Sequence, residues 1–131
     1  MVNGKIVMNK RKILIIDDEV VFITILKMSL KRTGNYEVRI ENQSINAVAT
    51  MRDFKPDLIL LDIMMPEKNG NEIAAYVKND KGLKHIKIVF LTAVLNAEEI
   101  GIKADIAARG VVISKPVKFD RLIECIEEQL N

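Results

Sequence analysis

The side chains best suited to chemistry in this sequence are acids, a hydroxyl and an amine, each placed directly after a short apolar run. They are Asp17, Asp18, Asp62, Thr92 and Lys115. Carboxylates packed together repel one another, and a hard divalent cation relieves that repulsion. Oxygen ligands with open water positions favour Mg²⁺, with Mn²⁺ as the alternative. A carboxylate beside such a cation can attack phosphorus, while a lysine and a threonine can bind the phosphoryl oxygens.

Each of these residues has an ordinary structural explanation when it is taken alone. An aspartate at a strand end is commonly a turn or cap residue. The run Asp17-Asp18-Glu19 could merely favour the N-terminus of a following helix through the helix dipole. Lys115 alone is a surface charge, and Thr92 alone is a β-branched strand residue. These side chains can act as one site only if the fold brings them together.

Five short segments are typical of β-strands, and these strands would have to bring the candidate side chains together. Four of them are continuous apolar runs, at residues 13–16, 58–61, 88–91 and 111–113. The fifth, residues 36–40, alternates between apolar and charged side chains. Continuous runs are typical of parallel strands buried on both faces, whereas the alternating segment is predicted to be an edge strand.

Segments with helical spacing of apolar residues lie between the strands. They predict helices over residues 21–31, around 45–52, around 73–77, over 97–108 and over 119–130. Strand and helix alternate five times, which is the pattern of a doubly wound α/β domain with a parallel sheet. Such sheets bind ligands at the carboxyl ends of their strands. The candidate acids, hydroxyl and amine then converge on one edge of the sheet.

Length and composition restrict the class of protein further. The 131 residues fit one domain, and 49% hydrophobic with 29% charged residues is typical of a globular protein with its own core. A net charge of +2 and 5% aromatic residues give little basis for a nucleic-acid-binding face. The single cysteine, Cys125, fits a reducing compartment and is expected to fill space in the last helix, while His85 is expected to be solvated. With no membrane-spanning run and no signal peptide, we expect a cytoplasmic protein.

Four short segments together form a specific pattern. They are Asp17-Asp18, the stretch PDLILLDIMMPEKNG at residues 56–70, Thr92-Ala93 and Lys115-Pro116. In this order and spacing they resemble the receiver domain of two-component response regulators. The resemblance implies a flavodoxin-like (βα)5 three-layer sandwich whose five-stranded parallel sheet has the order 2-1-3-4-5. We expect residues 1–11 to be an N-terminal extension and residues 12–131 to form the receiver domain.

The resemblance also implies a role for each site residue. Asp62 resembles the phosphoacceptor, and Thr92 and Lys115 resemble the residues that contact the phosphoryl group. The metal ligands would be Asp18 directly, Asp17 largely through water, Asp62, and the backbone carbonyl of Met64. The Lys115-Pro116 peptide bond is expected to be cis.

A receiver domain implies particular partners. The phosphoryl donor would be a sensor histidine kinase or a histidine phosphotransfer protein, with Mg²⁺ as cofactor. The output would pass to a downstream protein through the face formed by the fourth helix, the fifth strand and the fifth helix, and phosphorylation could also drive homodimerisation. We expect no direct binding of nucleic acid or membrane, and no turnover of an external substrate.

Two departures from the common receiver pattern affect signalling and lifetime. Val112 stands three residues before Lys115, where many receivers have Tyr or Phe, so an aromatic rotamer switch is not expected there. Met64 and Val94 are apolar at positions where polar residues can orient an attacking water. We therefore predict slow self-dephosphorylation.

Three other functions are compatible with parts of this pattern. A haloacid-dehalogenase-type phosphatase also uses Asp, Mg²⁺, Thr and Lys, but it needs its nucleophile in a DxD arrangement after the first strand, where this chain has Asp17-Asp18. A flavodoxin-like electron carrier needs Ser, Thr and Gly in that first loop to bind a phosphate. A receiver that is never phosphorylated could still act as a protein-binding module.

Overall fold

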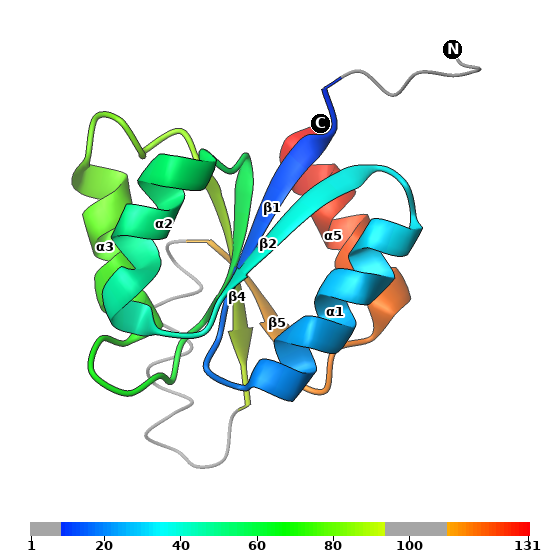
Figure 1. The fold of residues 1–131 in the computed structure, drawn as a ribbon, viewed down its shortest axis with the longest axis horizontal. Helices are drawn as coiled ribbons and strands as arrows, with labels where there is room; N and C mark the ends of the chain where they lie inside the picture. The colour runs from blue at the N-terminus through cyan, green and yellow to red at the C-terminus, as the bar shows by residue number, and fades with distance from the viewer. Residues whose placement is uncertain (1–8, 94–109) are drawn as a thin grey trace.

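The computed structural model describes residues 9–93 and 110–131 of the chain. Within these residues, five strands form one parallel sheet in the order β2-β1-β3-β4-β5 (Figure 1). The strands are β1 (Arg11–Ile16), β2 (Tyr36–Glu41), β3 (Leu58–Asp62), β4 (Lys87–Thr92) and β5 (Val111–Ser114). The helices are α1 (Val20–Arg32), α2 (Ala47–Phe54), α3 (Gly70–Asn79) and α5 (Phe119–Leu130), and the 3₁₀ turn η1 (Ser44–Asn46) precedes α2.

The helices cover both faces of the sheet. α2 and α3 lie on one face, and α1 and α5 lie on the other (Figure 1). Successive residues of β1 point alternately into the two interior layers, as the period of a strand requires. Leu14 and Ile16 pack on the side of α2 and α3, whereas Ile13 and Ile15 pack on the side of α1 and α5. A central strand that is buried on both sides needs an apolar residue at every position, which explains the continuous runs.

The predicted fold class and strand order are confirmed, with one difference at the sheet edge. The alternating segment is β2 at one edge of the sheet, as expected. The run at 111–113 forms β5 at the other edge, where Val111 and Val112 are only half-buried. The expectation of burial on both faces therefore holds for the central strands but not for β5, because an edge strand has a neighbouring strand on one side only.

The helix ends follow the signals in the sequence. α1 is followed by Gly34, whose φ of 80° is the left-handed conformation that glycine adopts without strain. α2 is closed by Lys55, which also has a positive φ and stands before Pro56. α5 covers Phe119–Leu130, as predicted. The predicted helix at residues 97–108 lies outside the described residues.

The structure also bears on the predictions for Cys125, His85 and the N-terminal boundary of the domain. Cys125 is buried against the α1 and α5 side of the sheet, and His85 is exposed. Arg11, which we assigned to an N-terminal extension, is the first residue of β1, and residues 1–8 lie outside the described part, so the boundary stays a prediction. Among the described residues, no helix is long and apolar enough to cross a membrane.

Candidate functional site at the carboxyl edge of the sheet

Neighbouring strands of the sheet end at the candidate residues. Asp17 follows β1, Asp62 is the last residue of β3, Thr92 is the last residue of β4, and Lys115 follows β5. The strands are parallel, so these ends lie at the same edge of the sheet. The main chain fixes two of them further, since the N–H of Lys115 donates to the carbonyl oxygen of Thr92 at 2.7 Å.

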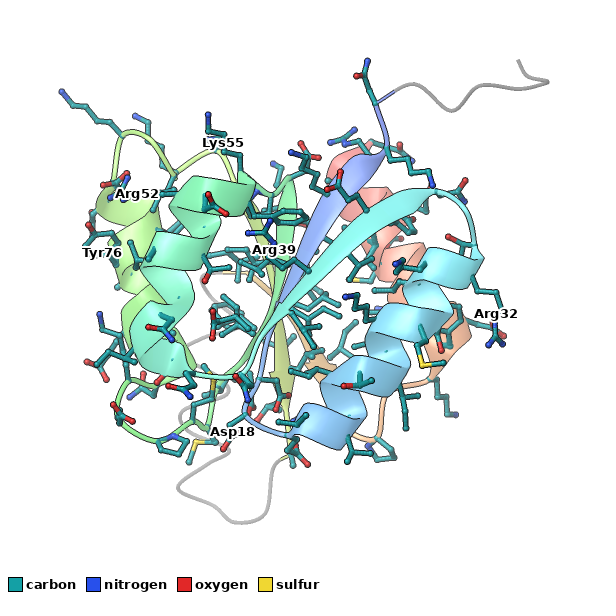
Figure 2. The ribbon with its side chains drawn as sticks, in the orientation of Figure 1. Asp18, Arg32, Arg39, Arg52, Lys55 and Tyr76 are labelled. Carbon is teal, nitrogen blue, oxygen red and sulfur yellow. The ribbon has the colours of Figure 1, made fainter. Side chains whose placement is uncertain are left out.

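The three predicted acids form one cluster. Carboxylate oxygens of Asp17, Asp18 and Asp62 all lie within 4.8 Å of one another. Asp17 and Asp62 are buried, and Asp18 is exposed on the loop after β1 (Figure 2). A set of hard oxygen donors that is open to water on one side suits Mg²⁺ or Mn²⁺, both of which keep several waters when they are bound. The residues present therefore fit the expected metal.

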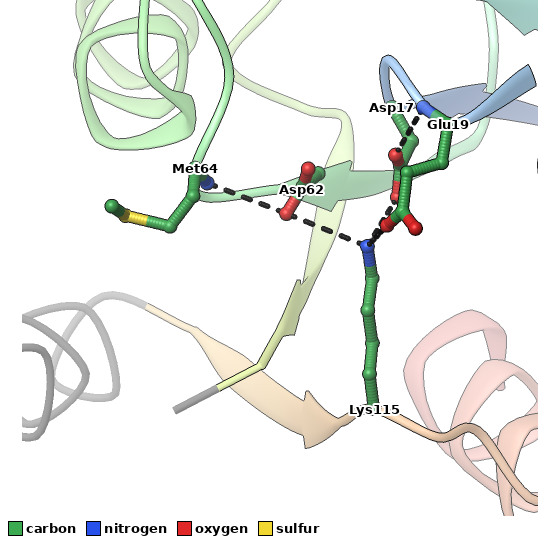
Figure 3. Close-up of polar contacts among 5 residues, drawn as sticks. All are labelled: Asp17, Glu19, Asp62, Met64 and Lys115. Carbon is green, nitrogen blue, oxygen red and sulfur yellow. Dashed lines mark hydrogen bonds and ion pairs between the residues drawn. The ribbon is translucent and has the colours of Figure 1, made fainter. Parts of the chain in front are cut away.

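The ammonium group of Lys115 reaches into this cluster. Its Nζ lies 2.8 Å from Oδ2 of Asp17 and 3.8 Å from Oδ1 of Asp62 (Figure 3). It also lies 2.6 Å from Oε1 of Glu19 and 4.8 Å from the centre of the Phe22 ring. The side chains of Lys115, Asp17 and Asp62 are 13% exposed or less, so water screens the ion pairs among them little, whereas Glu19 is 60% exposed. The Lys115-Pro116 peptide bond is cis, as expected.

Burial and mutual repulsion change the acidity of the two inner carboxyls. Burial raises the pKa of Asp62 to about 7, and the charge of Asp17 adds to this, while Lys115 and the N–H of Met64 oppose it. Burial also raises the pKa of Asp17, against hydrogen bonds from Lys115 and from the backbone of Glu19. For Lys115 burial disfavours the charged form, but its hydrogen bonds to Asp17 and Glu19 outweigh burial and raise its pKa. Without a bound metal ion, the Lys115 ammonium does not fully offset the burial and repulsion of the two inner carboxyls.

The loop between β3 and α3 is held by tight backbone contacts. The N–H of Gly70 donates to the carbonyl oxygen of Ile63 at 2.9 Å. A Cβ on Gly70 would lie 2.3 Å from the backbone oxygen of Asp62, closer than atoms can approach. The hydroxyl of Ser44 donates to the carbonyl oxygen of Pro66 at 2.7 Å and fixes the middle of the loop. Only glycine therefore fits where α3 begins against the end of β3.

The side chain of Met64 points away from Asp62 and is 49% exposed (Figure 3). Its backbone N–H donates to Oδ1 of Asp62 at 3.3 Å, so the main chain of this residue borders the acidic cluster. The predicted role of its carbonyl oxygen as a metal ligand stays a prediction. Val94, the other residue on which the predicted lifetime depends, lies outside the described residues.

Sequence reasoning did not assign Glu19 or Phe22 to the site. Of the acidic run, only Asp17 and Asp18 are predicted site residues, yet Glu19 at the N-cap of α1 makes no side-chain cap hydrogen bond and binds Lys115 instead. The signal was present, because Glu is not among the residues that cap helices well. The capping box of Asn69 and Glu72, which starts α3, was also missed although its spacing is visible in the sequence.

The strand order, the two covering helix layers and the acidic edge define a flavodoxin-like α/β domain with an acidic site. The sequence pattern of the response regulator receiver domain matches residues 13–127. The chain belongs to this family, whose domains act in two-component signalling. The rival assignments to a haloacid-dehalogenase-type phosphatase and to a flavodoxin-like electron carrier are thereby set aside.

Individual relatives agree with this assignment. The polar-differentiation response regulator DivK of Brucella anthropi is 30% identical over 122 residues, which are 92% of this chain and 97% of that protein. The receiver domain of a histidine kinase from Syntrophus aciditrophicus has a TM-score of 0.81 at 27% identity, covering 92% of this chain and 89% of that one. The chemotaxis protein CheY4 of Vibrio cholerae has a TM-score of 0.80 at 25% identity, covering 93% and 100%.

Proposed function

We propose that Asp62 accepts a phosphoryl group from a phosphohistidine of a sensor histidine kinase or a histidine phosphotransfer protein. The observation that carries the proposal is the meeting of the Asp17, Asp18 and Asp62 carboxylates within 4.8 Å, with the Lys115 ammonium 3.8 Å from Asp62. Asp62 is 4% exposed, so its carboxylate is largely shielded from water at the edge of the sheet.

The transfer is a displacement at phosphorus. An oxygen of the Asp62 carboxylate forms the new P–O bond, the P–N bond to the donor imidazole breaks, and the electron pair leaves with that nitrogen. Lys115 moves onto one phosphoryl oxygen, and the Thr92 hydroxyl donates to another. Asp62 must be ionised to attack phosphorus. Burial raises the pKa of Asp62, and a cation bound at the site would lower it again and so favour the ionised form.

Asp17, Asp18, Asp62 and the carbonyl oxygen of Met64 would hold Mg²⁺, with Mn²⁺ as the alternative. The cation would neutralise charge on the carboxylates and on the phosphoryl oxygens. The fold holds the buried Asp17 and Asp62 and the exposed Asp18 together at the ends of the neighbouring strands β1 and β3. The exposure of Asp18 leaves a route for the cation and for its remaining waters.

The product is a switched state of this chain rather than a released molecule. We infer that the domain is not a turnover enzyme and that its aspartyl phosphate is long-lived, because the apolar side chains of Met64 and Val94 cannot orient an attacking water. The switch would act on a downstream protein through the predicted fourth helix together with β5 and α5, or through homodimerisation on that face. With Val112 half-buried on β5, the signal would pass through Thr92 and the backbone rather than through an aromatic side chain.

The proposal places the chain in the cytoplasm, acting on proteins and not on nucleic acid or membrane. The single cysteine is buried and free, which agrees with a reducing compartment. The basic residues are spread over the sequence and are accompanied by only 5% aromatic residues, so no nucleic-acid face is indicated.

Intact mass after incubation with acetyl phosphate and Mg²⁺ tests the proposal, with Asp62→Ala beside the wild type. One added phosphoryl group that is absent in Asp62→Ala, and absent with EDTA, is the expected result. If no adduct forms and beryllofluoride also fails to bind, the chain is a protein-binding module that is not phosphorylated.

A further inference from the structure

The ammonium group of Lys115 is held off-centre in the site. It makes hydrogen bonds to Glu19 at 2.6 Å and to Asp17 at 2.8 Å, whereas Asp62 at 3.8 Å lies beyond hydrogen-bond distance. The dashed contacts in Figure 3 show this arrangement, with Lys115 reaching the end of β1 and the start of α1. A phosphoryl group on Asp62 would therefore compete with Glu19 and Asp17 for the same ammonium.

Glu19 is placed for this contact and not for the helix that it precedes. It is the N-cap residue of α1, but its side chain accepts no hydrogen bond from the helix backbone. Its own backbone N–H donates to Oδ1 of Asp17 at 2.9 Å, which fixes the residue beside the site. Its side chain is 60% exposed yet turns inward to the largely buried Lys115. One turn further along α1, the ring of Phe22 lies 4.8 Å from the same ammonium.

We propose that Glu19 is a positioning residue that holds Lys115 away from Asp62 and so restrains phosphoryl capture. The inference rests on the proposed function, in which Lys115 leaves its carboxylate partners to pair with a phosphoryl oxygen. A cation bound at Asp17 would displace Lys115 from that residue, but Glu19 is not among the proposed metal ligands. Glu19 thus remains as a competitor for the ammonium at the moment of transfer.

Glu19→Gln weakens the competition while keeping the length and shape of the side chain. A hydrogen bond to a neutral amide is weaker than one to a carboxylate. Because the side chain caps nothing in α1, the variant is expected to fold as the wild type does. We expect phosphorylation by acetyl phosphate to be about two- to fivefold faster, since a partly exposed ion pair contributes of this order. We expect beryllofluoride, measured with Mg²⁺, to bind more tightly by a similar factor.

Removal of a negative charge could by itself attract an anionic donor, and two controls separate that effect. Glu67→Gln removes an exposed carboxylate from the loop after β3, and Glu67 is not among the described carboxylates that contact Lys115. The second control adds Glu19→Gln to Lys115→Met, in which there is no ammonium to release. We expect no acceleration and no tighter beryllofluoride binding in either control.

The measurements are the rate of mass increase with acetyl phosphate, in which Asp62 displaces acetate, and the beryllofluoride titration. Equal or slower phosphorylation of Glu19→Gln would overturn the role of Glu19, as would an equal acceleration in Glu67→Gln or in the Lys115→Met background. In these cases the wild type is still phosphorylated, and the proposed function stands. If the wild type takes up no phosphoryl group and no beryllofluoride, the proposed function fails, and the role of Glu19 fails with it.

Discussion

At the scale of the residue, the site is a balance of three acids and one ammonium. Asp62 has a pKa of about 7 because it is buried beside the Asp17 carboxylate. A carboxyl whose pKa is higher in the folded than in the unfolded chain binds its proton more tightly when folded. Protonation of Asp62 therefore stabilises the folded metal-free protein, and this contribution to the free energy of unfolding is lost as the pH rises.

We predict that the free energy of unfolding of the metal-free protein falls between about pH 4 and pH 7, the interval between the unfolded and folded pKa values of Asp62. A shift of about three pH units corresponds to at most roughly 4 kcal/mol. Urea unfolding in EDTA at several pH values measures it, and Asp62→Asn should flatten much of the slope. Stability that rises through this interval would contradict the assignment.

Magnesium should reverse that loss, because a ligand that binds only the folded state stabilises it. The stabilisation should be larger at pH 8 than at pH 5, where Asp62 carries its proton and competes with the cation. The same urea titrations with added Mg²⁺ measure the difference. Mg²⁺ should stabilise Asp62→Asn less than it stabilises the wild type.

Residue identity also sets the lifetime of the phosphorylated state. Met64 turns its exposed side chain away from Asp62 and offers no group that could orient a water. Met64→Asn combined with Val94→Glu should speed loss of the phosphoryl group, by roughly tenfold or more if a positioned polar group contributes as general base catalysis usually does. The decay of the phosphorylated mass after removal of acetyl phosphate gives the rate. An unchanged rate would mean that these two side chains do not determine the lifetime.

At the scale of the element, the junction of β3 and α3 controls the geometry of the phosphoacceptor. Gly70 opens α3 so close to β3 that a Cβ would lie 2.3 Å from the Asp62 carbonyl oxygen and 2.9 Å from the Cα of Ile63. Both are backbone atoms, so relief requires movement of the strand end that carries Asp62. The start of α3 is fixed in turn by its capping box, in which Asn69 and Glu72 bind each other's backbone.

Gly70→Ala should therefore lower the free energy of unfolding by about 1–3 kcal/mol, as overpacking does, and should also slow phosphorylation. Gly82→Ala is the matched control, because its Cβ would meet flexible side-chain ends and no backbone atom: the carboxylate of Asp80 at 3.3 Å and the guanidinium of Arg52 at 3.7 Å. Urea unfolding and the rate of mass increase give the two readouts. Equal effects of the two substitutions would show that the close approach at Gly70 is not what matters.

At the scale of the whole molecule, the site depends on two interior layers that hold the strands in register. Phe90 of β4 is fully buried in the interior layer between the sheet and the helices α2 and α3. It belongs to the strand that ends at Thr92 and pairs with β3, which ends at Asp62. Phe90→Ala should cost about 3–5 kcal/mol of stability, since it removes a large side chain and leaves a cavity. Ile25→Ala, on the exposed face of α1, should change it by less than about 1 kcal/mol. Urea unfolding compares the two, and similar losses would contradict the assigned core.

The fold could be predicted from the sequence because its determinants are local and repeated. The buried part of each central strand is a continuous apolar run, while the edge strand β2 alternates, so the burial of β1, β2 and β3 is visible in five or six residues. The residues that follow these runs must lie at one edge whatever the detailed packing is. Asp17, Asp62 and Lys115 could therefore be assigned to one place without coordinates.

The tertiary structure decided what depends on distances between distant segments. Only packing could show that Lys115 lies nearer to Glu19 and Asp17 than to Asp62, because a lysine has several rotatable bonds and three acids within its reach. Only the crossing of β3 and α3 could show that Gly70 touches the backbone of Asp62. The half-burial of β5 likewise follows from its place at the sheet edge, which an apolar run cannot reveal. The sequence determined which groups meet, since their order along the chain fixes the topology, whereas the structure decided which of them pair, since pairing is set by a few ångströms.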